Sequence, residues 1–350
     1  MVSLRIEPLD ADDASAVDAV AALYAAADAA DRPWHPPYRP AFIRVLATHG
    51  WDDGPLQFFL GRDDAGALVA VGDVFLPARD NRHTALVGGS VRPERRGAGV
   101  GSAVYDHVEA VAARAGRTRI FTGGPESEAG RRFAERRGYA LGSVGMDRHL
   151  DLAATSAERV QAVFDEAAAH ARDYELLRLA GPMPDELLDA YADTVSAIND
   201  APLDDLEIDD EIFDADRVRS YERGQILSGR RLYRVLARQR GTGEIAGHTV
   251  VAVETDPPGF ALQHDTTVVR AHRGHRLGLL LKADMMRWLR DAEPGARILA
   301  TQNAASNAHM IAVNERLGYR VMGRSMEFQL DLPVGAAASS QRAGSVTGTA

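Results

Sequence analysis

Two short segments rich in glycine and arginine carry the clearest chemical signal in this sequence. They are RRGAGVG at residues 95–101 and HRGHRLG at residues 272–278. Each lies between a strand-like run and a stretch with apolar residues at helical spacing, which predicts a tight turn that opens a helix. Such a turn directs several backbone N–H groups and the positive end of the helix dipole at one point. Both segments therefore predict a site for an anionic group such as a phosphate.

The two turns differ at their central position. In the first turn Gly97, Gly99 and Gly101 remove side chains where a pyrophosphate would approach, and Arg96 adds positive charge. In the second turn Arg276 stands where the first has Gly99. Two arrangements are open. Either Arg276 turns outward and the backbone still holds the phosphate, or its side chain occludes the turn and the second site binds no cofactor.

The turns belong to an internal repeat. ERRGYALGSVGMDRHLDL at residues 135–152 and ERLGYRVMGRSMEFQLDL at residues 315–332 share eight residues without a gap, at an offset of 180. A spacing of this length is too long for a solenoid and indicates a duplicated domain. We expect one domain over residues 1–152, a second over residues 153–332, and a disordered tail of small residues over 333–350.

Each half has the same order of expected elements. A short strand and helical material come first, followed by a strand hairpin, a further strand, the turn with its helix, another strand, a helix and the shared final segment. The hairpins cover residues 56–76 and 231–254, and their linkers RDDAG and QRGTGE are typical turn sequences. This order predicts an α+β fold of two tandem domains. Each is a mixed, mostly antiparallel sheet flanked by helices, with one parallel crossover.

The composition narrows the classes of partner. The chain has 350 residues, a net charge of −10 and no cysteine. The acidic balance argues against nucleic acid as a partner and is compatible with a cationic substrate. The absence of cysteine excludes disulfides and thiolate metal sites, no histidine or carboxylate cluster has metal-ligand spacing, and no apolar run is long enough to cross a membrane. We therefore expect a cytoplasmic protein with no metal, nucleic-acid or membrane partner.

The turns and the repeated Glu-Arg-x-Gly-Tyr segment resemble, in both halves, the GNAT superfamily of acyl-CoA-dependent N-acetyltransferases. The turn of that family reads Arg/Gln-x-x-Gly-x-Gly/Ala, which is matched at Arg96, Gly99 and Gly101, and in the second copy at Arg273 and Gly278. The tandem arrangement is similar to that of mycothiol synthase-type proteins. The resemblance implies acetyl-CoA or another short acyl-CoA as the cofactor, a small-molecule amine as the partner, and a monomer or homodimer.

The resemblance also assigns residues to the cofactor. A backbone N–H on the strand before each turn polarises the acyl carbonyl, at positions that correspond to Val91 and Val268. In the second half the cofactor-binding residues expected are Val268, Val269, Arg273, Gly274, His275, Arg276, Leu277, Gly278, Asn303 and Asn307. In the first half they are Val91, Arg96, Gly97, Gly99 and Gly101. Asn307 is also placed to cap a helix, a role that does not exclude contact with pantetheine.

Transfer to an amine needs a base, because a free alkylamine is mostly protonated near neutral pH. In the second half His264 and Asp265 lie on the strand before the turn, and Glu254 ends the preceding strand as a further candidate. Alternation puts His264 on the same face as Val268 and Asp265 on the opposite face. We predict His264 as the base and Asp265 as the group that orients or binds the amine. The alternative is a strand histidine without a role. The equivalent first-half strand carries no titratable side chain, so we expect catalysis in the second domain.

Both copies depart from the family where it often carries a tyrosine acid for the leaving thiolate. Ala134 and Asn314 occupy that position, which puts a tyrosine acid in doubt. A thiol with a pKa of about 8.5 is a tolerable leaving group unaided. Asn314 is then expected to hydrogen-bond the sulfur or the pantetheine.

The second half also contains an acidic segment. Nine carboxylates fall between Asp200 and Asp216. One interpretation is a solvated loop. The other is that Asp204, Asp205 and Glu207 bind the substrate by attracting cationic amines.

The leading hypothesis is an acetyl-CoA-dependent N-acetyltransferase that acts on a small cationic amine by direct acyl transfer in the second domain. A non-catalytic acyl-CoA-binding sensor and a protein N-acetyltransferase remain alternatives.

Overall fold

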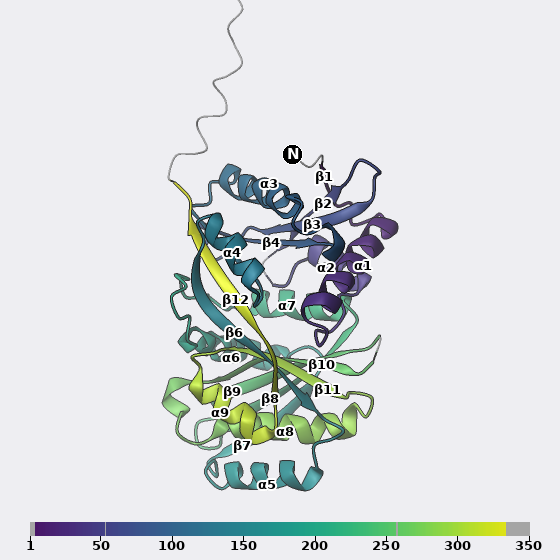
Figure 1. Ribbon diagram of the computed structural model, residues 1–350. Coiled ribbons are helices and arrows are strands. Elements are labelled where there is room, and N and C mark those ends of the chain that lie inside the picture. The colour runs from purple at the N-terminus through teal and green to yellow at the C-terminus, as the bar shows by residue number, and fades with distance from the viewer. Residues whose placement is uncertain (1–3, 53, 257, 334–350) are drawn as a thin grey trace, which may run out of the picture.

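The computed structural model describes residues 4–52, 54–256 and 258–333. Their strands form one 12-stranded sheet in the order β1-β2-β3-β4-β5-β12-β6-β11-β10-β9-β8-β7 (Figure 1). The first repeat supplies β1 (Arg5–Pro8), α1 (Ala14–Asp31), α2 (Pro40–Thr48), β2 (Gln57–Arg62), β3 (Leu68–Phe75), β4 (Thr84–Val91), η1 (Pro93–Arg95), α3 (Val100–Arg114), β5 (Arg119–Pro125), α4 (Glu128–Arg136) and β6 (Ala140–Asp151). The second supplies α5 (Ala157–Ala168), β7 (Tyr174–Ala180), α6 (Asp185–Val195), η2 (Ser196–Asp200), α7 (Ala215–Leu227), β8 (Arg230–Gln239), β9 (Ile245–Glu254), β10 (Phe260–Val268), η3 (Arg270–His272), α8 (Leu277–Ala292), β11 (Ile298–Ala304), α9 (Ala308–Leu317) and β12 (Arg320–Asp331).

The expected α+β architecture is confirmed, with one addition. Both hairpins, both turn-helix-strand units and both final strands appear in the predicted order. Helix α5 has no counterpart in the first repeat and was not among the expected elements. Of the predicted tail at 333–350, only Pro333 lies within the described residues.

The two repeats exchange their last strands. β12, from the second repeat, pairs with β5 of the first, and β6, from the first repeat, pairs with β11 of the second. β6 and β12 also pair with each other, and in Figure 1 they run together from the upper half of the molecule to the lower half. The sequence boundary at Leu152 therefore does not coincide with a break in the sheet.

Each half of the sheet is split at its parallel pair. β4 and β5 pair only over residues 84–86 and 119–121, and β10 and β11 pair only over residues 260–262 and 298–300. Beyond these residues β5 follows β12 and β11 follows β6, so the parallel strands part. We call the opening between β10 and β11 the second fork. Along it the β11-facing backbone groups of β10 have no strand partner and are available to a ligand.

The helices beside the second fork are held by a continuous apolar core. Leu150 of β6, Leu281 of α8, Leu299 of β11 and Leu317 of α9 are all buried in one cluster. Burial of each leucine stabilises the fold by roughly 1.5–3 kcal/mol. α6 and α7 pack in a second cluster, and Figure 1 shows α7 between the two halves of the molecule. The core thus fixes both the fork and the helix that joins the repeats.

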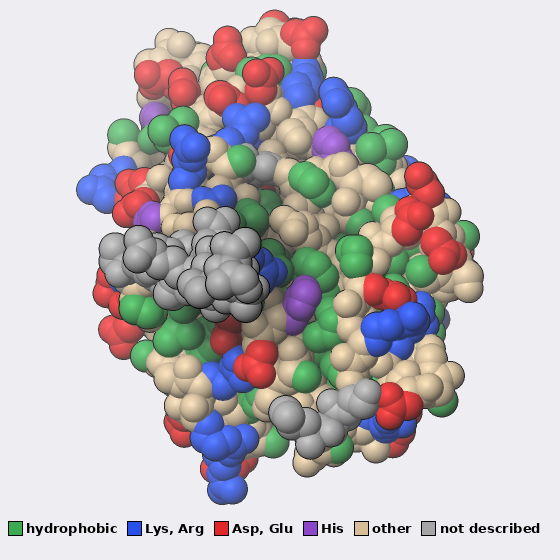
Figure 2. Space-filling view, turned by 90° about the horizontal axis from the view of Figure 1, so that it is seen from above, with side chains coloured by type: hydrophobic (Ala, Val, Ile, Leu, Met, Phe, Trp, Pro, Cys, Tyr) green, Lys and Arg blue, Asp and Glu red, His purple; other side chains and the backbone are tan. Residues whose placement is uncertain are grey.

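The described residues include no helix long and apolar enough to span a bilayer. On the face seen in Figure 2, acidic and basic side chains are interspersed. A continuous basic surface of the kind that binds nucleic acid is not present on that face.

Candidate functional site

The two predicted anion-binding turns have matching backbones. In the second, Gly274 has φ 89° and Arg276 has φ 55°. In the first, Gly97 has φ 74° and Gly99 has φ 85°. Among the described residues, the backbone N–H groups of 97–102 and of 274–279 have no backbone acceptor. Each turn thus presents a row of free donors at a helix N-terminus, which is the arrangement that binds phosphate.

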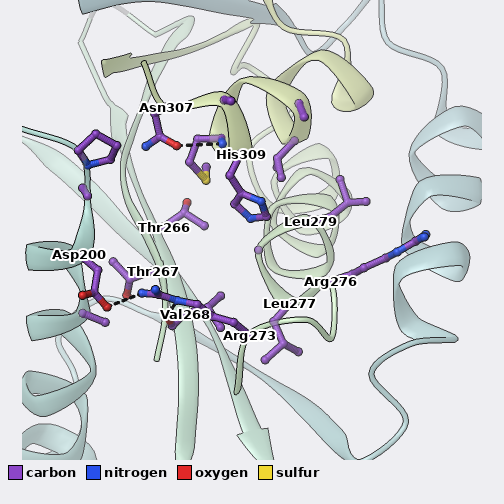
Figure 3. Close-up of a pocket in the computed structure, with 18 of the residues that line it drawn as sticks. Asp200, Thr266, Thr267, Val268, Arg273, Arg276, Leu277, Leu279, Asn307 and His309 are labelled. Carbon is purple, nitrogen blue, oxygen red and sulfur yellow. Dashed lines mark hydrogen bonds and ion pairs between the residues drawn. The ribbon is translucent and has the colours of Figure 1, made fainter. Parts of the chain in front are cut away.

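Arg276 adopts the left-handed conformation that Gly99 adopts, but its side chain leaves the turn. The guanidinium points away from the cavity in Figure 3 and pairs with Glu166 of α5, which also pairs with Arg316. Of the two arrangements left open by the sequence, the structure therefore has the outward one. The turn remains open, and the Arg276 charge is balanced by a carboxylate.

The open turn predicts a small effect for Arg276→Gly. Glycine removes the cost of a left-handed side-chain-bearing residue, roughly 1–2 kcal/mol, while the lost half-exposed ion pair contributes about 0–1 kcal/mol. We expect Tm to change by less than about 4 °C and acetyl-CoA affinity by less than about twofold. Calorimetric titration and a thermal melt measure both. A gain in affinity of tenfold or more would show that Arg276 obstructs the site.

Arg96 and Arg273 occupy the same place in the two turns and are already neutralised. Nε of Arg273 donates to the carbonyl of Val268 at 3.1 Å, and its Nη2 lies 2.6 Å from Asp200. Arg96 does the same with Val91 at 3.2 Å and with Asp31 at 2.7 Å. Both arginines therefore connect the end of a strand to a helix. Because their charges are already paired, we propose that the backbone N–H groups of the turn bind the phosphate.

A cavity of about 830 Å³ lies between the second turn and α9. Thr266, Thr267 and Val268 of β10 line the cavity together with Asn307 (Figure 3). Gly278 at the start of α8 lines it as well. Oδ1 of Asn307 accepts from the N–H of Met310 at 3.1 Å, so Asn307 caps α9 and borders the cavity at once. The cavity is large enough for a substantial part of a cofactor, and Thr266 and Thr267 in its lining belong to the part of β10 beyond its pairing with β11.

The other residues expected at the cofactor are spread around this cavity. Leu277 is buried and lines it, and Val268 packs against the core beneath it. His275 turns its ring toward Tyr174, with centroids 5.4 Å apart. Gly274 lines the cavity, and Val269 donates its N–H to Ala246.

The predicted alternation at His264 and Asp265 is wrong, because β10 contains a bulge there. Gln263 pairs with Val251 and Thr266 with Thr249, so two residues of β10 face a single residue of β9. A bulge places successive side chains on one side of the strand. His264 contacts Tyr221 of α7, while Val268 packs on the opposite face against the core. The charge of Arg234 acts on both His264 and Asp265, which is consistent with their sharing the α7 side.

His264 is a neutral imidazole in this setting. Its Nδ1 lies 2.5 Å from the hydroxyl of Tyr221, and its Nε2 is buried without a hydrogen-bond partner in the described structure. Burial, together with the charges of Arg230 and Arg234, lowers the pKa of His264 to about 3. An imidazole with so low a pKa is a weak base near neutral pH.

Asp265 has the properties that His264 lacks. In the part of the chain that the structure describes, its half-buried carboxylate has no hydrogen-bond donor and no ion-pair partner. Burial raises the pKa of Asp265 to about 6, and the charges of Asp52 and Glu211 add to the increase. An unpaired carboxylate with a pKa near the working pH suits proton abstraction.

The structure pairs Glu254 and the acidic segment with groups of the first repeat. Glu254 forms ion pairs with Arg230 of the second repeat, at 2.7 Å, and with Arg39 of the first repeat. Its carboxylate therefore connects the two repeats. Asp204 accepts from Ser143 of β6 at 2.6 Å, and Glu207 pairs with Arg119 of β5 at 2.7 Å.

Asp205 belongs to the same connection, because its N–H donates to the carbonyl of Gly142 at 2.9 Å. The acidic segment is largely exposed to solvent, and it is also held in place by contacts with the first repeat. It is a strap that fastens the second repeat to the strands of the first.

Asn314 takes part in a buried network instead of facing the cleft directly. Its Oδ1 accepts from Nζ of Lys282 at 2.7 Å, and its Nδ2 donates to Asn303 at 2.7 Å. Asn303 lies on β11 three residues beyond Ala300, the last residue paired with β10. The network thus reaches the closed end of the second fork.

Sequence reasoning missed Trp51, because it belongs to the other repeat. The Trp51 ring lies 5.0 Å from the His264 ring and 5.6 Å from the Tyr221 ring. Its neighbour Asp52 pairs with Arg217 of α7 at 2.9 Å. No local pattern connects a residue after α2 with a strand more than 200 positions later, so only the packing of α2 against α7 reveals it.

The first repeat also contains a carboxylate with a raised pKa. Burial raises the pKa of Asp73 on β3 to about 6. Asp73 accepts from the hydroxyl of Tyr24 at 3.3 Å and stands opposite Gly88 of β4. Asp73 differs from Asp265 in having a hydrogen-bond donor. Because both carboxyl groups have a raised pKa, Asp73→Asn is a matched control for Asp265→Asn.

Comparison with known proteins agrees with this geometry. Residues 22–139 match the acetyltransferase (GNAT) family. A tandem GNAT protein from the clavulanic acid biosynthesis pathway, in a structure determined without acetyl-CoA, is 26% identical with a TM-score of 0.75, covering 94% of this chain and 98% of that one. A GCN5-related N-acetyltransferase from Sphaerobacter thermophilus is 18% identical with a TM-score of 0.67, covering 94% and 95%. No curated protein sequence matches significantly.

Proposed function

We infer that this chain, which carries a GNAT acetyltransferase domain and has the tandem GNAT fold over nearly its whole length, transfers an acyl group from acyl-CoA to the amino group of a small cationic molecule in its second domain. The observation that carries the assignment to the second domain is the unpaired carboxylate of Asp265, directly before the residues that line the cavity. The family match itself covers the first repeat, so the domain assignment rests on this geometry.

Bound acyl-CoA supplies an activated thioester carbon. The free N–H groups of 274–279 hold the pyrophosphate, and the unpaired edge of β10 offers an N–H to the acyl carbonyl. Asp265 takes a proton from the approaching ammonium, and the neutral amine then attacks the thioester carbon. The C–S bond breaks as the C–N bond forms, CoA leaves as the thiolate, and the proton that the new amide nitrogen loses neutralises that thiolate. His264, fixed by Tyr221, forms the wall of the acceptor site.

The preference for a cation follows from the groups around Asp265. Asp52 and Glu211 lie close enough to raise its pKa, and Trp51 and Tyr221 offer aromatic rings. Carboxylates and ring faces together attract alkylammonium groups. This acceptor site replaces the strap residues Asp204, Asp205 and Glu207 in our proposal.

The test is the release of CoA from acetyl-CoA in the presence of amines of different charge. We expect turnover with small diamines or amino sugars. Turnover with amino acids should be low, because Asp265 repels their carboxylate. Binding of acetyl-CoA without acceleration by any amine would instead indicate a sensor. A preference for peptide N-termini would indicate a protein acetyltransferase.

Trp51→Ala tests whether the first repeat contributes to the acceptor site. Loss of one cation–π contact costs roughly 1–2 kcal/mol, so the KM for a cationic amine should rise about 5- to 30-fold. Because Trp51 does not line the cavity at the turn, the KM for acetyl-CoA should stay unchanged. Parallel increases in both constants would place Trp51 in a general structural role.

A further inference from the structure

Two cations are buried in the second half without an anionic partner. Lys282 of α8 is 1% exposed and Arg148 of β6 is 2% exposed. Within the described residues, Nζ of Lys282 donates to Oδ1 of Asn314, and neither side chain has a carboxylate partner. Nε and Nη1 of Arg148 are buried with no hydrogen-bond partner at all. Burial of unpaired charge and unsatisfied donors is costly, so such a pair calls for an anion.

Both cations lie at the closed end of the second fork. Arg148 pairs in register with Thr301, the first residue of β11 beyond its pairing with β10. Oγ1 of Thr301 donates to the carbonyl of Gln263, the first residue of β10 beyond that pairing, at 3.4 Å. The charge of Arg148 acts on Lys282, whose pKa is lowered to about 7 by burial first and by Arg148 second. The two cations therefore lie in one buried polar cluster.

Neutral polar groups complete this cluster. Asn303 of β11 accepts from Asn314 at 2.7 Å, and the hydroxyl of Tyr319 lies 3.4 Å from Gln263. Nζ of Lys282 lies 4.7 Å from the centre of the Tyr319 ring. None of these groups carries negative charge, so the cluster itself offers no anion to balance Arg148, or Lys282 when it is protonated. A bound anion would favour the protonated form of Lys282, whose pKa is lowered to about 7 without one.

The first repeat shows that the fold itself does not need these cations. Tyr105 stands nine residues after Arg96, as Lys282 stands nine residues after Arg273. Phe328 of β12 pairs with Thr122 of β5 as Arg148 of β6 pairs with Thr301 of β11. Ala134 holds the position of Asn314 in the shared final segment. The same architecture is thus built without charge in one half and with two cations in the other.

We propose that Lys282 and Arg148 form a subsite for a carboxylate at the far end of the acyl group, so that the preferred donor is a short dicarboxylic acyl-CoA such as succinyl-CoA. The proposal rests on the proposed function, because it requires acyl-CoA to lie in the second fork. With the pyrophosphate at the turn, the acyl end of the donor points to the closed end of the fork. A carboxylate there meets both cations and offsets the cost of their burial.

The leaving thiolate is the other anion that acyl transfer brings near this cluster, but it exists only after the acyl group has moved. Arg148 is charged throughout the cycle. A charge that is buried permanently is balanced better by a group present in the bound donor than by a transient one. The carboxylate is therefore the occupant that we favour.

Calorimetric titration of the full chain with succinyl-CoA and butyryl-CoA isolates the carboxylate, because the two acyl groups have the same number of carbons. We expect succinyl-CoA to bind at least about tenfold more tightly, the effect of a charge-assisted hydrogen bond. Equal affinities in the wild-type protein would overturn the proposal. If no acyl-CoA binds, the proposed function fails together with this inference.

Arg148→Phe, which copies the first repeat, and Lys282→Met test the two cations separately. Each should remove most of the succinyl advantage, leave butyryl-CoA affinity within about twofold, and keep or raise the Tm of the ligand-free protein because an unpaired charge is removed. Arg148→Gln and Lys282→Gln repeat the test with polar side chains. A fall in Tm with equal loss of both donors would assign the cations a structural role and contradict the subsite.

Discussion

Asp265→Asn should lower kcat for acyl transfer roughly 100-fold to 10,000-fold, the range associated with loss of a general base. Asparagine keeps the size of the side chain but cannot accept the proton of an ammonium group. The carboxylate has no partner in the described structure, so no hydrogen bond is lost and the fold should be unaffected. The measurement is the initial rate of CoA release with saturating acetyl-CoA and the best amine found in the charge panel.

The pH profile gives an independent readout of the same group. Because the pKa of Asp265 is raised to about 6 by burial, kcat/KM should rise with pH through that value and level off above it. The base is active when deprotonated, so activity is lost as the pH falls below about 6. In Asp265→Asn this acid limb should disappear. If the acid limb persists unchanged in Asp265→Asn, it reports the titration of another group.

Asp73→Asn is the matched control, since the pKa of Asp73 is also raised to about 6 by burial. If chemistry occurs in the second domain, this variant should retain nearly full activity. Loss of turnover in Asp73→Asn with normal turnover in Asp265→Asn would move the catalytic centre to the first domain. The single family match to residues 22–139 makes that comparison informative.

Gly278→Asp should weaken acyl-CoA binding to the second domain by at least about 100-fold. A Cβ on Gly278 would meet no atom within 4 Å, and the residue lines the cavity, so the new carboxylate fits there without steric conflict. It would face the pyrophosphate, and two like charges about 4 Å apart repel by roughly 4 kcal/mol near a protein surface. An acid in the first turn of a helix stabilises it by about 0.3–1 kcal/mol, so the variant should fold normally.

Gly101→Asp makes the same change in the first turn, where a Cβ would meet only Val91 and Phe133 at ordinary distances of 3.7 and 3.8 Å. Titration of both variants with acetyl-CoA counts the sites in each domain. Two sites in the wild-type protein and one in each variant would show that both domains bind. Unchanged affinity in both variants would contradict the assignment of the turns.

The turn residues illustrate what local sequence can predict. Gly97 and Gly99 adopt positive φ, which glycine tolerates best, so local sequence alone was enough to predict the first turn. In the second turn the sequence left open whether Arg276 occludes the site, because arginine rarely adopts such a φ. Its conformation persists because Arg276 pairs with Glu166, a contact that spans 110 residues and leaves no local signal.

The candidate site shows where local sequence is insufficient. Strand alternation assigned His264 and Asp265 to opposite faces, and a single bulge reversed that assignment. Bulges depend on how a strand fits its neighbours, not on its own periodicity. The sequence predicted His264 as the base, whereas our proposal gives that role to Asp265. The reason is that burial and the charges of Arg230 and Arg234 lower the pKa of His264.

The sequence by itself determined the duplication, the order of elements, the α+β class, the positions of the two turns for which we predict anion binding, and the resemblance to acyl-CoA-dependent N-acetyltransferases. All of these rest on short-range periodicity, turn chemistry and a repeated segment. Only the tertiary structure decided the exchange of β6 and β12, the strap formed by the acidic segment, the approach of Trp51 to His264 and the meeting of Lys282 with Arg148. Each of these joins residues far apart in the chain, and which distant surfaces meet is set by the packing of the whole sheet and its helices.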